Sequence, residues 1–163
     1  MFKKIVLSTA LVLCANAAFA ADNNVYVGFD AGSTKIDSVN GRKGSFGAFG
    51  GYQFSREIAV EAGYRRLASF TMFGADVDTK QTALSLVASS NITKDLDFFG
   101  RVGYNKLSVS ASVRGYTGSA SDSGALFGLG LGYHFTENVS ARVEWQRAAK
   151  DTTNLNAGLV FKF

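Results

Sequence analysis

The residue of this chain best suited to acid–base chemistry near neutral pH is its one histidine, His134. A histidine activates a serine or threonine hydroxyl only when the two groups lie within hydrogen-bond distance. The nearest hydroxyl residue that follows it is Thr136, and both residues stand beside a short polar turn. We therefore expect His134 to be a solvated residue at a strand end, and we predict no catalytic site.

Ligands for a metal ion or a cofactor are not grouped in the sequence. No paired spacing of His, Asp and Glu suggests a metal, and no glycine-rich loop precedes a helical pattern. The single cysteine, Cys14, lies in an apolar N-terminal segment, so the rest of the chain has no thiol and no disulfide. We predict neither a metal nor a cofactor.

Four charged residues are more informative, because each lies in the middle of a segment where apolar residues alternate with small or polar ones. These residues are Glu61, Arg101, Arg142 and Glu144. The alternation puts them on the face opposite the apolar side chains. An unpaired charge in a narrow enclosed space is costly, so charges on an inner face must pair. We predict an interior ion-pair network of these four residues, with Arg65, Asp97 and Lys162 near its ends.

The elements that carry these charges have a period of two, which is typical of β-strands. The alternating segments span residues 25–32, 45–54, 58–65, 82–89, 96–105, 125–135, 139–146 and 155–163. The chain has no proline, so every backbone N–H can join a ladder. Segments of roughly ten residues have the length with which a tilted strand crosses a bilayer.

The connections between these segments alternate in length. The connections at Ser55–Arg56, Ile92–Asp95 and Thr136–Asn138 are tight, and those at Ile36–Lys43, Ser69–Thr79, Ser108–Asp122 and Ala148–Thr153 are longer and polar. Short turns at one end and longer loops at the other are typical of outer-membrane barrels. With an even number of strands, both ends of the barrel domain should lie at the short-turn, periplasmic end.

The N-terminus has the features of a cleaved signal peptide. Lys3 and Lys4 precede an apolar stretch from Ile5 to Ala18, and Ala18-Phe19-Ala20 fits a cleavage site. We predict a signal peptide over residues 1–20 and one barrel domain over 21–163. Without Lys3 and Lys4 the 17 basic residues become 15, against 13 acidic ones, and no basic patch is interleaved with aromatics. Nucleic acid is therefore a poor candidate partner.

Alternation alone does not say which face of the barrel points inward. A soluble, lipocalin-like barrel would put large apolar side chains inside. Here the second face consists mostly of Gly, Ser and Ala, which suit a narrow lumen, and the apolar face is free of charge in several strands. We expect aromatic belts at both ends of the apolar face: Tyr52, Phe54, Phe98, Tyr133, Phe135, Phe161 and Phe163 at one end, and Tyr64, Tyr104 and Trp145 at the other. The prediction is an all-β fold, a membrane-spanning eight-stranded antiparallel up-and-down β-barrel in the bacterial outer membrane, in contact with its lipids.

Several of these segments resemble the transmembrane domain of the outer membrane protein A (OmpA) family. The matching segments are residues 47–53, 60–64, 95–103, 141–146 and 157–163. Because the chain stops at Phe163, it is most similar to the OmpA/OmpX-like small barrels that lack a periplasmic domain. The resemblance implies that Phe163, with Phe161 and Leu159, forms a signal read by the outer-membrane assembly machinery.

The same resemblance implies a gate-like ion pair between Glu61 and Arg142. In the family these two residues have alternative partners, a lysine and a glutamate, but Val87 and Gly132 occupy those positions here. A network that simply fills the lumen is therefore the favoured interpretation.

The functional expectation is a structural and interaction protein that displays surface loops and has no catalysis. The loop at Ser69–Thr79 carries Phe70, Met72 and Phe73, and the loop at Ser108–Asp122 carries Arg114 and Tyr116. These loops are candidates for an extracellular ligand, and Arg65, Arg66 and Arg114 for contact with lipopolysaccharide. The alternative is a narrow, low-conductance channel gated by Glu61 and Arg142, and a third possibility is a lipid-modifying barrel enzyme.

Overall fold

The described residues of the computed structural model are 24–36, 41–72, 75–113, 116–149 and 152–163. The predicted signal peptide lies outside them, as do Phe73 and Arg114 of the predicted loops. Eight strands follow one another: β1 Val25–Ile36, β2 Arg42–Gln53, β3 Ile58–Met72, β4 Ala75–Asn91, β5 Leu96–Val113, β6 Tyr116–His134, β7 Val139–Ala149 and β8 Thr152–Lys162.

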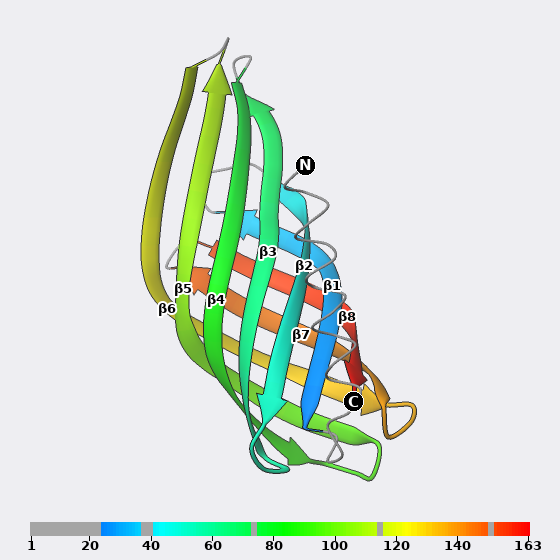
Figure 1. Ribbon diagram of the computed structural model, residues 1–163. Helices are drawn as coiled ribbons and strands as arrows, with labels where there is room; N and C mark the ends of the chain where they lie inside the picture. Colours follow the sequence, from blue (N-terminus) through cyan, green and yellow to red (C-terminus); the bar gives the residue numbers. More distant parts are fainter. Residues whose placement is uncertain (1–23, 37–40, 73–74, 114–115, 150–151) are drawn as a thin grey trace.

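Each strand pairs antiparallel with the next, and the first and last strands close the cylinder (Figure 1). The closing ladder runs from Tyr26 opposite Lys162 to Ile36 opposite Thr152. The predicted eight-stranded antiparallel up-and-down barrel is therefore confirmed.

The three tight turns share one local structure, in which a hydroxyl holds two backbone N–H groups. The Ser55 Oγ accepts from the N–H groups of Glu57 and Ile58 at 3.2 and 3.1 Å. Thr93 and Thr136 do the same at the other two turns. A side-chain acceptor at the start of a turn replaces a backbone partner, which explains why Ser and Thr occur there. The described ends of the chain lie at this end too, because the N–H of Phe163 donates to the Val25 carbonyl at 2.9 Å.

The prediction of long loops at Ser69–Thr79 and Ser108–Asp122 is wrong. The β3–β4 ladder continues to Met72 opposite Ala75, and the β5–β6 ladder continues to Val113 opposite Tyr116. The other two long connections are also shorter than expected, since β1 reaches Ile36 and β8 begins at Thr152. A strand that stands clear of the bilayer needs no apolar face, so the alternating pattern fades and its Ser, Gly and Asp residues look like loop residues.

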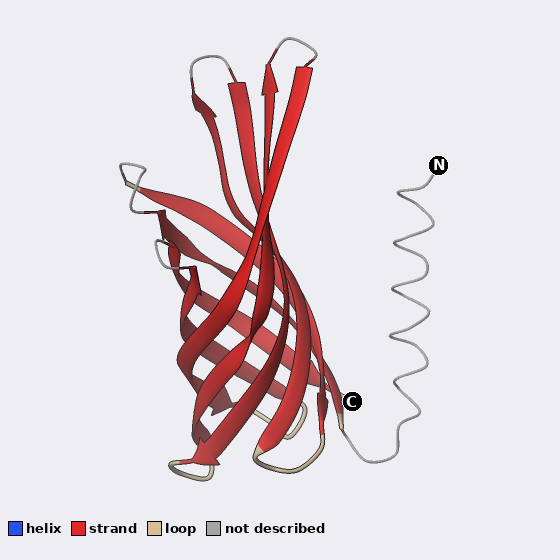
Figure 2. Ribbon diagram, turned by 90° about the vertical axis from the view of Figure 1, so that its left-hand side faces the viewer, coloured by secondary structure: helices blue, strands red, loops and turns tan. Residues whose placement is uncertain are grey.

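Strands β3 to β6 continue beyond their neighbours as a four-stranded sheet, which we call the projecting sheet (Figure 2). The β2–β3 ladder ends at Phe46 opposite Arg66, and the β6–β7 ladder ends at Phe127 opposite Arg147. The edges of the projecting sheet are therefore Leu67–Met72 of β3 and Tyr116–Leu126 of β6, with parts of β4 and β5 between them.

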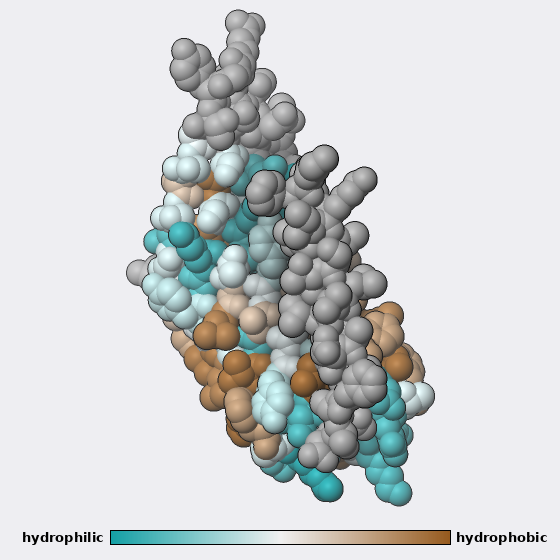
Figure 3. Space-filling view, viewed as in Figure 1, coloured by the Kyte–Doolittle hydropathy of each residue, from teal (hydrophilic) through white to brown (hydrophobic). Residues whose placement is uncertain are grey.

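The barrel is apolar outside and largely polar inside. Outward-facing Phe29, Leu84 and Phe127 expose more than half of their surface, whereas inward-facing Glu61 and Glu144 are each 1% exposed. Apolar side chains form a band below the middle of the face seen in Figure 3, and hydrophilic ones lie above it and at its lower edge. Among the described residues, Tyr26, Phe49, Ala59, Val87 and Phe99 form a small apolar cluster in the interior, against which Val160 packs.

Candidate functional site: a lumen closed by ion pairs

Four of the sequence-predicted residues, Glu61, Arg101, Arg142 and Glu144, meet in the lumen, and we call them the central ion cluster. Arg101 Nη2 lies 2.5 Å from Glu61 Oε2, and its Nε lies 2.7 Å from Glu144 Oε1. Arg142 Nη1 lies 2.8 Å from Glu61 Oε1, and its Nη2 lies 3.6 Å from Glu144 Oε2. Two arginines thus face two glutamates, so the cluster carries no net charge.

Aromatic side chains complete the cross-section around the cluster. The Tyr26 hydroxyl donates to Glu61 Oε1 at 2.9 Å. The guanidinium of Arg142 lies over the Phe49 ring at 3.7 Å from its centroid and 5.5 Å from that of Phe99. A cation over an aromatic face gains electrostatic attraction in a dry site. The rings therefore hold Arg142 in place as well as filling space.

A second ion pair lies beside the central cluster and was missed as a pair by the sequence analysis. Arg65 Nη2 lies 2.5 Å from Asp30 Oδ2, and its Nη1 donates to Gln146 Oε1 at 2.8 Å. The Gln146 amide donates in turn to Glu144 at 3.4 Å. The expectation that Arg65 contacts lipopolysaccharide is wrong, because its side chain is buried inside the barrel. Arg66, the next residue, faces outward and pairs with Asp78.

The lumen is narrow enough that bulky side chains face glycines on the adjacent strand. Tyr26 lies opposite Gly51, Phe49 opposite Gly28, and Phe99 opposite Gly130. A Cβ at any of these glycines would overlap the ring opposite it. The glycines of the inner face therefore provide the space that the aromatic and charged side chains occupy.

Beyond the cluster, toward the projecting sheet, short polar side chains and two leucines fill the lumen. The Ser45 Oγ donates to Asn154 Oδ1 at 3.0 Å, and the Asn105 amide donates to the Ala148 carbonyl at 2.7 Å. Leu67 and Leu126 have no exposed surface. The lumen is thus filled at two levels.

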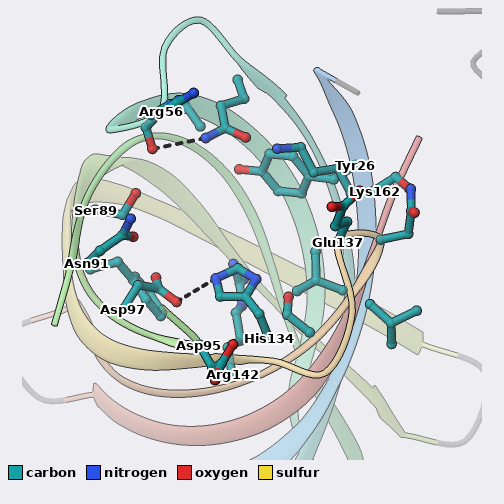
Figure 4. A pocket seen from close by; sticks show the side chains of 18 of the residues that line it. Tyr26, Arg56, Ser89, Asn91, Asp95, Asp97, His134, Glu137, Arg142 and Lys162 are labelled. Atoms are coloured by element: carbon teal, nitrogen blue, oxygen red, sulfur yellow. Dashed lines mark hydrogen bonds and ion pairs between the residues drawn. The ribbon is translucent and has the colours of Figure 1, made fainter. Parts of the chain in front are cut away.

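Toward the short turns, the lumen widens into a cavity of about 560 Å³ whose floor includes Glu61 and Arg142. Asp97 and His134 point toward each other in this cavity, with Nε2 3.0 Å from Oδ1 (Figure 4). The His134 side chain is 46% exposed, so it lies at the solvated rim, where the sequence placed it. The Thr136 hydroxyl instead accepts backbone N–H groups. In the described part of the chain, no group of His, Cys, Asp or Glu side chains could hold a metal ion.

The aromatic residues of the outer surface lie toward the two ends of the barrel. Near the short turns, Tyr52 and Phe54 meet edge to face at 5.0 Å, and Tyr133 and Phe135 at 5.3 Å. Tyr64, Tyr104 and Trp145 are exposed toward the other end. A closed barrel with an apolar outer surface, aromatic belts and a charged interior satisfies every requirement of a hydrocarbon environment. The fold and the lumen therefore define a transmembrane β-barrel.

The chain belongs to the outer membrane protein beta-barrel domain family, whose model matches residues 5–163. It is an outer-membrane protein of the small, OmpA-like type that the sequence resemblance indicated. No curated protein sequence matches it significantly.

Solved structures of small barrels have the same fold at low sequence identity. Neisserial surface protein A matches with a TM-score of 0.71 and 18% identity, over 85% of this chain and 97% of that chain. The N-terminal barrel of Pseudomonas aeruginosa OprF matches with a TM-score of 0.63 and 19% identity, over 85% and 97%. Ail, the attachment invasion locus protein of Yersinia pestis, matches with a TM-score of 0.61 and 17% identity, over 86% and 97%. At these identities the likeness is one of fold.

Proposed function

We propose that this outer-membrane protein is a structural and interaction protein that displays the projecting sheet at the cell surface and has no catalytic activity. The observation that carries this proposal is the continuation of β3 to β6 beyond the barrel as a sheet with two strand edges. Outer-membrane barrels have short turns on the periplasmic side and longer segments outside. The three tight turns therefore support an extracellular position for the sheet, where binding function tends to lie.

The lumen supports the same proposal, because its charges are balanced and its cross-section is filled. Asp30, Glu61 and Glu144 face Arg65, Arg101 and Arg142 inside the barrel. An interior that is packed with paired charges has no field that attracts ions of one sign. A barrel of this kind serves as a rigid scaffold for what it carries.

The sharpest test shortens one hairpin of the sheet without touching the membrane-spanning wall. Residues 109–120, whose described part pairs from Val109 opposite Ala120 to Val113 opposite Tyr116, are replaced by an Asn-Gly turn. We expect this variant to keep its heat-modifiable migration on gels. Cells that express it should no longer bind to host-cell or bacterial surfaces. Unchanged binding to host-cell or bacterial surfaces by the shortened variant would contradict the proposal.

A collar of outward-facing cations supports lipopolysaccharide as one partner. Arg66, Lys106 and Arg147 each follow a residue of the outer aromatic belt by two positions: Tyr64, Tyr104 and Trp145. Lys35 and Arg42 are exposed near the outer ends of their strands, and Lys80 is exposed opposite Arg66 at the base of the projecting sheet. Cations directly above an aromatic belt lie at the level of the lipid phosphates. The structure of Ail was solved in complex with the heparin analogue sucrose octasulfate, so a barrel of this fold can accept a polyanion.

Removing two charges of the collar tests this partner. We expect Lys80→Gln with Lys106→Gln to weaken binding to nanodiscs that contain lipopolysaccharide, because phosphates lose two cations. Lys94→Gln, at an exposed short turn, is the matched control and should bind normally. Equal binding by the unmodified protein, the double variant and Lys94→Gln would show that the collar does not contact lipopolysaccharide.

A narrow channel is the second candidate, and the cavity at the short-turn end favours it. That cavity reaches Glu61 and Arg142, so the central ion cluster and the outer level of the lumen, which includes Leu67 and Leu126, separate it from the other side. Arg142 also has a second carboxylate within reach, that of Glu144. The positions of the family's alternative partners hold a buried Val87 and Gly132, which lies opposite Arg142. Unitary currents in planar bilayers that change in Arg142→Gln would favour a channel over a structural and interaction protein.

A lipid-modifying enzyme is the third candidate. Its catalytic group would have to be His134, which lies at the short-turn end and pairs with Asp97. Mass spectra of lipid A from cells with and without the protein test this candidate, and we expect them to be the same.

A further inference from the structure

One edge of the projecting sheet is unusual because a long stretch of strand pairs on one side only. Strand β6 pairs with β5 from Tyr116 to Tyr133, but its ladder with β7 begins at Phe127. Among the described residues, no strand pairs with the free side of Tyr116–Leu126. Such an edge presents unpaired N–H and C=O groups and is a template for another strand.

The sequence of this edge reads nearly the same in both directions. Residues 118–124 are Gly-Ser-Ala-Ser-Asp-Ser-Gly, with Ser121 at the centre. Two antiparallel copies centred on Ser121 would place Gly118 opposite Gly124 and Ser119 opposite Ser123. Residues 118–123 are exposed, and their side chains are small enough to leave the backbone accessible.

The single acidic residue of the edge does not oppose itself in this pairing. Asp122 of one copy lies opposite Ala120 of the other, on the same face of the sheet. The two Asp122 residues are then diagonal neighbours, with about 7–8 Å between their backbone positions. A strand that opposed its own acid directly would be repelled, so the sequence is compatible with its own copy.

We propose that this edge of β6 pairs antiparallel with the same edge of a second copy of the chain. Antiparallel neighbours with matching faces are related by a two-fold axis perpendicular to the sheet. That axis inverts the second barrel, so the second copy lies in an opposing outer membrane rather than in the same one. The β6–β7 ladder ends at Arg147, and the strand of the second copy lies beside β6 where that ladder has ended.

The distance between the two membranes follows from the length of β6 between the barrel rim and Ser121. Ser121 is six residues beyond Phe127, roughly 20 Å at a rise of about 3.3 Å per residue. The two barrel rims would stand roughly 40 Å apart along the strands. The contact therefore joins closely apposed membranes, and it rests on the proposed display of the sheet at the cell surface.

The first test uses charge at the paired positions, with full-length protein in phospholipid vesicles and outward display verified by protease access. We expect unmodified vesicles to cluster in light scattering. In Ala120→Asp, the new acid of each copy lies opposite Asp122 of the other copy, so two pairs of like charges form. Clustering should then fall about tenfold, which corresponds to a loss of about 1.4 kcal/mol in binding free energy. The double variant Ala120→Asp with Asp122→Lys restores opposite charges and should restore clustering. Ser108→Asp, on the neighbouring interior strand opposite Ser121, is the control and should cluster normally.

The second test reads the register directly. In a Cys14→Ser background, Ser119→Cys in one vesicle population and Ser123→Cys in another should cross-link with a short thiol-reactive linker. Ser119→Cys alone in both populations should not, because the two thiols would be four residues apart. Cross-linking of Ser119→Cys with itself, or clustering that Ala120→Asp and Ser108→Asp reduce equally, would overturn the proposal. The hairpin-shortening test is separate, because loss of binding to other surfaces there would still support an interaction protein.

Discussion

The guanidinium of Arg142 lies over the ring of Phe49, with 3.7 Å between its central carbon and the ring centroid. Phe49 comes from the second strand and Arg142 from the seventh, so this contact crosses the lumen rather than following a ladder. It gives the buried cation an aromatic face on one side and carboxylates on the other. Contacts of this kind across the lumen fill its cross-section.

Removing Glu61 should destabilise the barrel strongly. Glu61→Ala leaves Arg101 and Arg142 without one of their two carboxylates and removes the acceptor of the Tyr26 hydroxyl. Breaking a buried ion pair on one side costs about 3–5 kcal/mol. Urea unfolding in lipid vesicles measures this loss. Glu137→Ala, at an exposed turn, should change the free energy of unfolding by less than about 0.5 kcal/mol.

The same network predicts strong coupling between Glu61 and Arg142. Removing both as Glu61→Gln with Arg142→Gln leaves Arg101 and Glu144, which still neutralise each other. We expect the double variant to lose less free energy of unfolding than the two single variants together. A double-mutant cycle in the same unfolding assay gives the coupling energy. Additive losses would show that the two side chains act independently.

Two adjacent glycines provide a matched test of lumen packing. Gly51 faces the Tyr26 ring, where a Cβ would overlap the phenol, whereas a Cβ at Gly50 would meet only the Tyr26 carbonyl oxygen at 3.8 Å. We expect Gly51→Ala to cost about 1–3 kcal/mol, because the ring must move away from Glu61. Gly50→Ala should be nearly neutral in the same assay. Equal stability of the two variants would contradict the tight packing of the lumen.

The single tryptophan reports the depth of the outer aromatic belt. Trp145 is 44% exposed on the apolar surface. We expect its fluorescence to be quenched more by lipids brominated near the headgroup than by lipids brominated near the chain end. Val143→Trp in a Trp145→Phe background lies two residues nearer the bilayer centre and should reverse that preference. Quenching that does not change between the two proteins would contradict the depth assigned to the belt.

The proposed assembly signal predicts that a variant of Phe163 is inserted poorly into the outer membrane of cells but refolds normally as a purified protein. Phe163→Ala should lower the amount of protein in the outer membrane, because the assembly machinery loses the terminal aromatic. Refolding of the purified variant into detergent should be normal, since its backbone bond to Val25 remains. Phe135→Ala, an exposed aromatic at the same end, is the control. Equal surface levels of the two variants would contradict the signal.

The sequence predicted the faces of the strands correctly because alternation depends only on local geometry. Parity placed Glu61, Arg101, Arg142 and Glu144 on the face opposite the apolar side chains, and the small residues of that face indicated that it points inward. The positions of the tight turns were also predicted, since they follow from the short spacing between alternating segments. These features required no knowledge of which strands are neighbours or how far each is shifted.

The partners inside the lumen were harder to predict because they depend on the shear of the whole barrel. Asp30 and Arg65 lie 35 residues apart in sequence, and Tyr26 reaches Glu61 across the same separation. An inward-facing tyrosine among small residues was a signal for a buried hydroxyl with a partner. The projecting sheet was missed for another reason: its strands are solvated, so residues such as Ser108 and Ser110 carry no alternating pattern.

The pairing of Tyr26, Phe49 and Phe99 with a glycine on the adjacent strand has a consequence for how such barrels diverge. A side chain inside the cylinder cannot grow at one rung unless the residue across that rung shrinks, as between Phe99 and Gly130. Changes in the lumen of this barrel should therefore accumulate as reciprocal exchanges of volume between residues that lie opposite each other on adjacent strands. The outward surface contacts fluid acyl chains and is under no such constraint, so its residues can be substituted one at a time.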